Sequence, residues 1–197
     1  MVHLYVANVS ALPEPLECPD IMKALPTERR KKILSCKQKQ KRLQCLGAGL
    51  LLNKVLSRYG ISSELVYVDS NGKPIVDGIY FNLSHSGDLV ICAVSEKTVG
   101  CDIEKIKDAP KQVAERSFSE EEREHLKTYS GYEYNREFFR IWTRKESYLK
   151  MTGAGLRVPL NMLEIKDCYM QEYEIPGYQI SVCAQENEFA ELVWKNV

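Results

Sequence analysis

The order of predicted elements constrains the fold of this sequence most, because a helix followed by strands occurs twice along the chain. Apolar spacing in the first part predicts a strand within 1–10, a helix over 27–59 that breaks near Ser35–Lys37, and strands over 65–68, 79–83, 89–94 and 99–103. In the second part it predicts helices over 119–127 and 136–151, and strands over 163–165, 168–174 and 178–184. We therefore expect an α+β fold made of two similar halves.

Charge and composition argue against several kinds of partner. Lys plus Arg and Asp plus Glu each number 27 in the 197 residues, whereas a protein that binds nucleic acid mainly through phosphates carries a basic excess. Apolar runs such as Leu89–Val94 are far shorter than a membrane span, and the first residues lack the pattern of a signal peptide. Seven cysteines without a C-x-x-C pair are typical of reduced thiols. We expect a cytoplasmic protein that binds neither nucleic acid nor a membrane.

The segment Gly100–Glu104 places two carboxylates close together. Asp102 and Glu104 are two residues apart in a predicted strand, so their side chains project from the same face, while Ile103 points into the core. Two like charges at this spacing repel each other, and a hard cation such as Mg²⁺, which prefers carboxylate oxygens, would compensate them. A strand edge with solvated carboxylates is the alternative interpretation.

A second charged pair lies in the predicted helix 136–151. Glu146 and Lys150 are one turn apart, so they form either an ordinary surface pair worth about 0.3–0.5 kcal/mol or a metal ligand beside a phosphate-binding cation. The motif Ser84–Ser86 contains His85 at a strand end, where it indicates either a phosphate contact or a polar hairpin. The basic run Arg29–Arg42 is likewise either a solvated face or a patch for a phosphorylated ligand.

Three of these motifs occur together in an order that resembles one enzyme family. Phe81–Ser86, Gly100–Glu104 and Trp142–Lys150, with Arg116–Ser119 between them, are similar to the 4'-phosphopantetheinyl transferases in their longer, two-half form, over about 71–156. The resemblance implies two similar α/β halves related by a pseudo-twofold axis, with the active site between them. It implies a monomer with an N-terminal half, 1–100, on the coenzyme A side and a C-terminal half, 101–197, on the metal and carrier-protein side.

The resemblance also implies a reaction. The family transfers the 4'-phosphopantetheine group of coenzyme A to a serine of an apo acyl or peptidyl carrier protein and releases adenosine 3',5'-bisphosphate, with Mg²⁺ or Mn²⁺ as cofactor. Asp102, Glu104 and Glu146 would hold the metal, and Glu146 would also act as general base, directly or through a water. Lys150 would stabilise the pyrophosphate charge, with Lys145 in support.

Further residues are implied to contact coenzyme A. Ser84 and His85 would bind its phosphates, and Lys73 lies in a segment, 71–74, that resembles the loop beside the adenine. Lys31 and Arg42 match the family's contacts to the 3'-phosphate.

The carrier protein would dock on the second half, around 109–122 and after Gly153. Two other functions stay open from the sequence alone. One is a carrier-binding module that kept the fold without catalysis, and the other is a Mg²⁺-dependent enzyme acting on nucleic acid.

Overall fold

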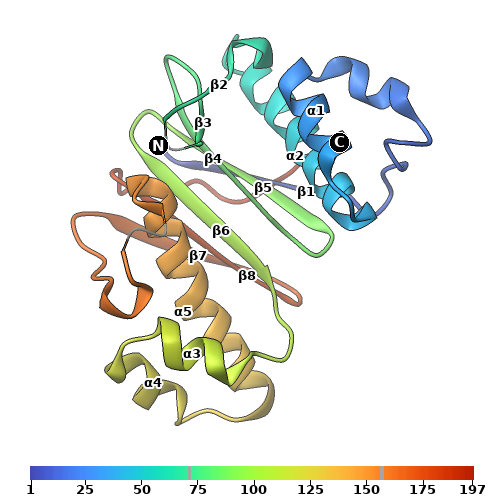
Figure 1. Cartoon of the computed structure of the whole chain (residues 1–197). Coiled ribbons are helices and arrows are strands. Elements are labelled where there is room, and N and C mark those ends of the chain that lie inside the picture. Colours follow the sequence, from blue (N-terminus) through green and yellow to red (C-terminus); the bar gives the residue numbers. More distant parts are fainter. Residues whose placement is uncertain (71, 156–157) are drawn as a thin grey trace.

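The computed structural model describes residues 1–70, 72–155 and 158–197, which form two main sheets flanked by helices (Figure 1). The first sheet has the order β4-β5-β1-β9, with β1 at His3–Asn8, β4 at Tyr80–Ser86, β5 at Leu89–Ser95 and β9 at Val193–Trp194. The second has the order β6-β8-β7, with β6 at Val99–Lys105, β7 at Tyr169–Ile175 and β8 at Tyr178–Ala184. Strand β9 pairs parallel to β1, and the other neighbours in these two sheets are antiparallel.

The helices and a small hairpin complete the described part of the chain. The α-helices are α1 (Thr27–Ser35), α2 (Lys39–Ser57), α3 (Lys111–Ser117), α4 (Glu120–Leu126) and α5 (Gly131–Thr152). The hairpin consists of β2 (Tyr67–Val68) and β3 (Pro74–Ile75), and short 3-10 turns occur at Pro19–Ala24, Ser63–Leu65 and Leu160–Met162. No helix among these described elements is both long and apolar enough to cross a membrane.

The two sheets pack face to face between two long helices. Alternate residues of β1 show why: Tyr5 and Ala7 pack with α2, while Leu4 and Val6 pack with apolar residues of β6 and β8. Since both faces of β5 and β8 are covered, every residue in these two strands is buried. The result is a layered α+β fold in which each sheet carries one long helix, as the sequence predicted. This arrangement is compatible with a pseudo-twofold relation.

Gly100 allows β6 to lie unusually close to α5. A Cβ atom at this position would lie 2.1 Å from the carbonyl oxygen of Ser147 and 2.3 Å from the amide nitrogen of Met151. Any side chain would therefore push the strand and the helix apart. This close contact brings the acidic residues of β6 beside the charged residues at the end of α5.

Several element predictions need correction. No strand forms over 163–165, because two apolar residues, Leu163 and Ile165, are too short a pattern to specify one. Helix α5 begins at Gly131 rather than 136, and α3 was not predicted, since Ala114 is its one buried residue and its apolar spacing is weak. The break between α1 and α2 is confirmed.

The division into halves at residue 100 stays a prediction. The boundary lies inside β6, and Val193–Trp194 return to the first sheet.

Candidate active site

Side chains of β4 join the two sheets along a polar seam, which we define as Asn82, Ser84, Ser86, Asp102 and Glu104. The Ser84 hydroxyl donates to Asp102 Oδ1 at 2.8 Å, and the Ser86 hydroxyl donates to Glu104 Oε2 at 2.7 Å. Asn82 Oδ1 accepts from a backbone N–H of β6 at 3.0 Å. The seam forms because every second residue of β4 faces β6, and every second residue of β6 faces back.

Lys150 of α5 contacts the seam at its Ser84–Asp102 pair. Its Nζ donates to Asp102 Oδ1 at 2.6 Å and to the Ser84 hydroxyl at 2.9 Å. Burial lowers the pKa of Lys150, but the negative charges of Asp102 and Glu146 outweigh this effect and the pKa is raised overall. Lys150 is therefore a firmly protonated cation within a group of acids.

Asp102 interacts electrostatically with two other acidic residues, Glu104 and Glu146. Burial raises the pKa of both Glu104 and Glu146, and the charge of Asp102 raises both pKa values further. Asp102 Oδ2 is buried without a hydrogen-bond partner among the residues that the structure describes, which is costly for a carboxylate oxygen. Within the described ranges, no three His, Cys, Asp or Glu side chains already surround one point as metal ligands. The unpartnered oxygen and the oxygen-only donor set nevertheless fit a hard cation.

His85 lies on the opposite side of β4 from the seam. Strand neighbours alternate, so Ser84 faces β6 while His85, like Phe81 and Leu83, lies on the α2 side. The surrounding protein lowers the pKa of His85 by desolvation, and the positive charges of Lys150, Lys32 and Lys41 lower it further. Its imidazole is therefore neutral at pH 7 and has basic side chains close by.

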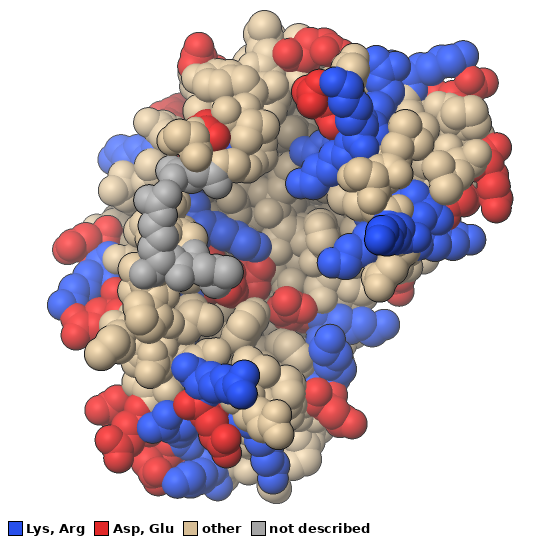
Figure 2. All heavy atoms as spheres, in the orientation of Figure 1, with Lys and Arg blue, Asp and Glu red and all other residues tan. Residues whose placement is uncertain are grey.

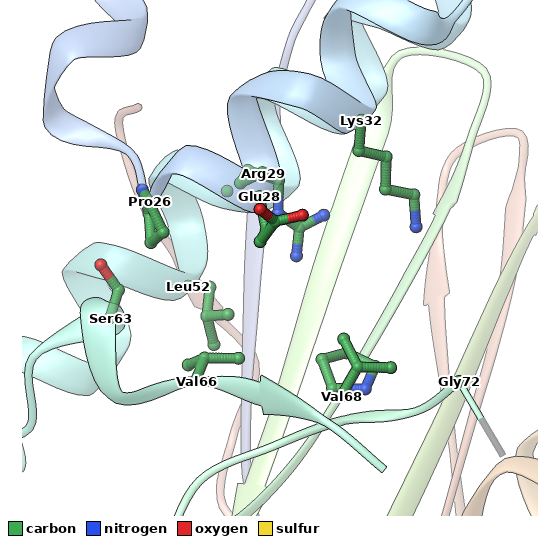
Figure 3. A pocket seen from close by; sticks show the side chains of 11 residues that line it. Pro26, Glu28, Arg29, Lys32, Leu52, Ser63, Val66, Val68 and Gly72 are labelled. Atoms are coloured by element: carbon green, nitrogen blue, oxygen red, sulfur yellow. The ribbon is translucent and has the colours of Figure 1, made fainter. Parts of the chain in front are cut away.

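A pocket lies between α1 and the β2–β3 hairpin (Figure 3). Its volume is about 130 Å³, and its lining includes Arg29, Lys32, Val68, Gly72 and Pro74. The side chains of Arg29 and Lys32 extend from α1 toward the hairpin (Figure 3), and burial lowers the pKa of Arg29. Figure 2 shows Lys and Arg side chains beside a recessed region of the surface, on the side where Figure 1 places α1 and α2. The pocket lining combines two cationic side chains with one carboxylate, Glu28, and with apolar side chains such as Leu52 and Val66.

Comparison with known proteins identifies the family. Residues 98–195 match the 4'-phosphopantetheinyl transferase superfamily. The chain is 31% identical to the 4'-phosphopantetheinyl transferase Sfp of Bacillus subtilis (strain 168) over 193 residues, which covers 86% of each chain. The chain belongs to the 4'-phosphopantetheinyl transferases. It is also 35% identical to the transferase psf-1 of Bacillus pumilus, over 75% of this chain and 73% of that one. The solved holo-acyl-carrier-protein synthase of Thermotoga maritima matches with a TM-score of 0.38 and 19% identity, over 46% of this chain and 64% of that one.

Two basic residues predicted to contact coenzyme A are not among the residues that line the pocket. Arg42 donates to Glu14 Oε1 at 2.7 Å and to the carbonyl oxygens of Cys36 and Lys37 at 2.9 and 2.8 Å, so it fastens the α1–α2 connection. Lys31 is exposed and pairs with Glu28 at 2.6 Å. The basic run Arg29–Arg42 indicated this part of the chain. The direction of side chains around α1 places Arg29 and Lys32 of that run in the pocket.

Two further lysines have protein partners that the sequence did not reveal. Lys73 Nζ donates to the carbonyl oxygen of Lys150 at 2.9 Å, which ties the hairpin loop to the end of α5. Lys145 Nζ donates to the carbonyl oxygen of Leu160 at 2.7 Å and pairs with Glu122 at 2.8 Å. Lys145 therefore lies on another side of α5 from Lys150, because a shift of five helical positions is about 140°. The predicted loop beside the adenine includes Asn71, and the region after Gly153 includes 156–157; these positions lie outside the described residues.

Proposed function

We propose that this transferase moves the 4'-phosphopantetheine group of coenzyme A to a serine hydroxyl of an apo acyl or peptidyl carrier protein. Family membership supports the reaction class. The observation that carries the proposal lies at the seam: Lys150 Nζ donates to Asp102 Oδ1 at 2.6 Å, and the charge of Asp102 raises the pKa of both Glu104 and Glu146. Such an arrangement can both neutralise phosphate charge and accept a proton.

In the proposed reaction, the serine oxygen bonds to the phosphorus nearer the pantetheine, and the bond to the other phosphate breaks. Adenosine 3',5'-bisphosphate leaves with the electron pair of that bond. Glu146 takes the serine proton, a role that its raised pKa supports, since a carboxylate is a better base when its pKa is nearer neutrality. Lys150 is placed to stabilise negative charge on the pyrophosphate, and His85 contributes a neutral donor.

Asp102, Glu104 and Glu146 are the residues that would hold a divalent cation in this proposal. Asp102 Oδ2 has no partner among the described residues, and the charge of Asp102 raises the pKa of both Glu104 and Glu146. When bound, Mg²⁺ or Mn²⁺ would supply positive charge to the pyrophosphate oxygens. Lys150 supplies part of this compensation from the chain itself.

The pocket beside α1 predicts which basic residues bind the 3'-phosphate. Arg29→Ala should weaken coenzyme A binding by about tenfold or more, because a charge-assisted contact to a phosphate is worth about 1.5–3 kcal/mol. Arg30→Ala is the matched control on the same helix: Arg30 hydrogen-bonds Thr27 and is not among the residues that line the pocket, so this variant should bind coenzyme A as tightly as the wild type. Calorimetric titration of each variant distinguishes the two sites. Equal losses in both variants would count against this pocket.

Intact-mass spectrometry tests the function directly. An apo carrier protein incubated with the enzyme, coenzyme A and Mg²⁺ should gain the mass of one phosphopantetheine group, and chelation of the metal by EDTA should prevent the gain. No gain with either acyl or peptidyl carriers, from a folded enzyme that binds them, would support a carrier-binding module instead. We place the carrier on the second half, around 109–122, which includes α3.

A further inference from the structure

The turn between β4 and β5 is held from both halves of the molecule. From the first half, Gln40 and Gln44 of α2 both donate to the carbonyl oxygen of Gly87, at 2.7 and 2.9 Å. From the second half, the Tyr178 hydroxyl accepts the backbone N–H of Asp88 at 3.0 Å. The turn is therefore a junction between α2 and the first residue of β8.

Gly87 shows how closely the junction is packed. Its φ of +53° lies in the left-handed region, and a Cβ atom here would lie 2.5 Å from the Tyr178 hydroxyl. Tyr178 itself is 9% exposed and packs with the apolar residues between the sheets. The tyrosine ring is thus fixed by the core, and its hydroxyl presents a defined anchor to the turn.

The anchored turn, Gly87–Asp88, directly follows His85 and Ser86, the last two residues of β4. Ser86 donates to Glu104 and accepts the backbone N–H of Lys105 at 3.1 Å, so this strand end is linked to β6 as well. His85 precedes Ser86, and its backbone is paired in register with Val90 of β5, the second residue after the turn. Its position depends on the path of the strand between the seam and the turn.

We propose that Tyr178 is a positioning residue for coenzyme A: it fixes the Gly87–Asp88 turn and thereby the place of His85 beside the basic residues of the first half. The inference rests on the proposed function, because it requires that His85 contacts the phosphates of coenzyme A. Nothing in the chemistry of the transfer requires a tyrosine at this place. Its contribution is made through His85 and not through contact with substrate.

A double-mutant cycle tests the inference by calorimetric titration with coenzyme A. Tyr178→Phe keeps the ring and removes the hydroxyl, and it should weaken binding about three- to tenfold, the range that loss of one ordinary hydrogen bond gives. In a His85→Ala background the same change should cause no further loss, because the residue it positions is gone. Additive losses, or unchanged binding by Tyr178→Phe, would overturn the inference.

Tyr173→Phe is the matched control in the neighbouring strand. Its hydroxyl donates to the carbonyl oxygen of Ala190 at 2.9 Å, away from the turn, so its loss should leave coenzyme A binding unchanged. Failure of the wild-type chain to bind coenzyme A would overturn the proposed function together with this inference. Normal wild-type binding with equal effects of the two tyrosine variants would overturn the inference alone.

Discussion

Replacing Glu146 by Gln is expected to reduce the rate of phosphopantetheine transfer by about 100-fold or more, with carrier binding unchanged. The reason is that a positioned general base contributes about 10²–10⁴-fold to a rate, and a carboxamide cannot accept the serine proton. The substitution preserves the size of the side chain in α5. Initial rates at saturating coenzyme A and carrier protein measure the loss in the chemical step.

Stability measurements on the same variant separate lost chemistry from lost folding. Burial and the charge of Asp102 raise the pKa of Glu146, so the folded metal-free protein binds this proton more tightly than the unfolded chain does. The contribution of Glu146 to stability is therefore greatest at low pH and falls as the pH rises through its folded pKa. The carboxamide that replaces the carboxylate does not ionise, and we expect Glu146→Gln to be more stable than the wild type at pH 8, by a margin that shrinks toward pH 5.

An exposed acid of the same helix provides the control for this prediction. Glu133 lies in the first turn of α5 and pairs with Arg136 at 3.3 Å, far along the helix from Lys150. Glu133→Gln should change neither the transfer rate nor the pH dependence of stability noticeably. Full activity in Glu146→Gln would contradict its role as base, even if the stability profile behaved as expected.

The sequence indicates which charged side chains of the candidate site share a face. The side chains of Asp102 and Glu104 share a face because strand geometry has a period of two, and those of Glu146 and Lys150 share a face because they are one helical turn apart. The strand period and the helical turn each relate residues within a single element, so both can be applied to the sequence alone. The contact between these two elements depends on Gly100, whose need for close approach is invisible until α5 is placed against β6.

The structure gives some of the predicted basic residues distant protein partners that the sequence does not indicate. Arg42 is bound by Glu14, which lies 28 residues earlier in a proline-containing connection, and Lys145 is paired with Glu122 of another helix. A basic residue within a basic run gives no signal of such a partner, because a flexible side chain can reach many positions. Lys32 reaches the pocket and Lys31 does not because neighbouring helical residues differ by about 100° in direction.

Replacing Lys150 by Met is expected to lower the free energy of unfolding by about 3 kcal/mol in the absence of metal, because removal of one partner from a buried ion pair leaves the other charge uncompensated. Asp102 is the partner left behind; its side chain is 6% exposed and Lys150 is 29% exposed. The double variant Lys150→Met with Asp102→Asn should recover most of that loss, since the uncompensated charge is gone. Denaturant unfolding of the two single variants and the double variant measures the coupling.

The same variant reports on the cation through stability rather than activity. If Asp102 contributes to a metal site, saturating Mg²⁺ should raise the melting temperature of Lys150→Met more than that of the wild type, because the cation then replaces the missing ammonium charge beside Asp102. Lys127→Met is the control, since Lys127 pairs with Glu124 on the surface and its loss should change little with or without Mg²⁺. An equal effect of Mg²⁺ on all three proteins would show that the buried carboxylate is not where the cation binds. Lys150 would then be the cation that balances the buried charge of Asp102.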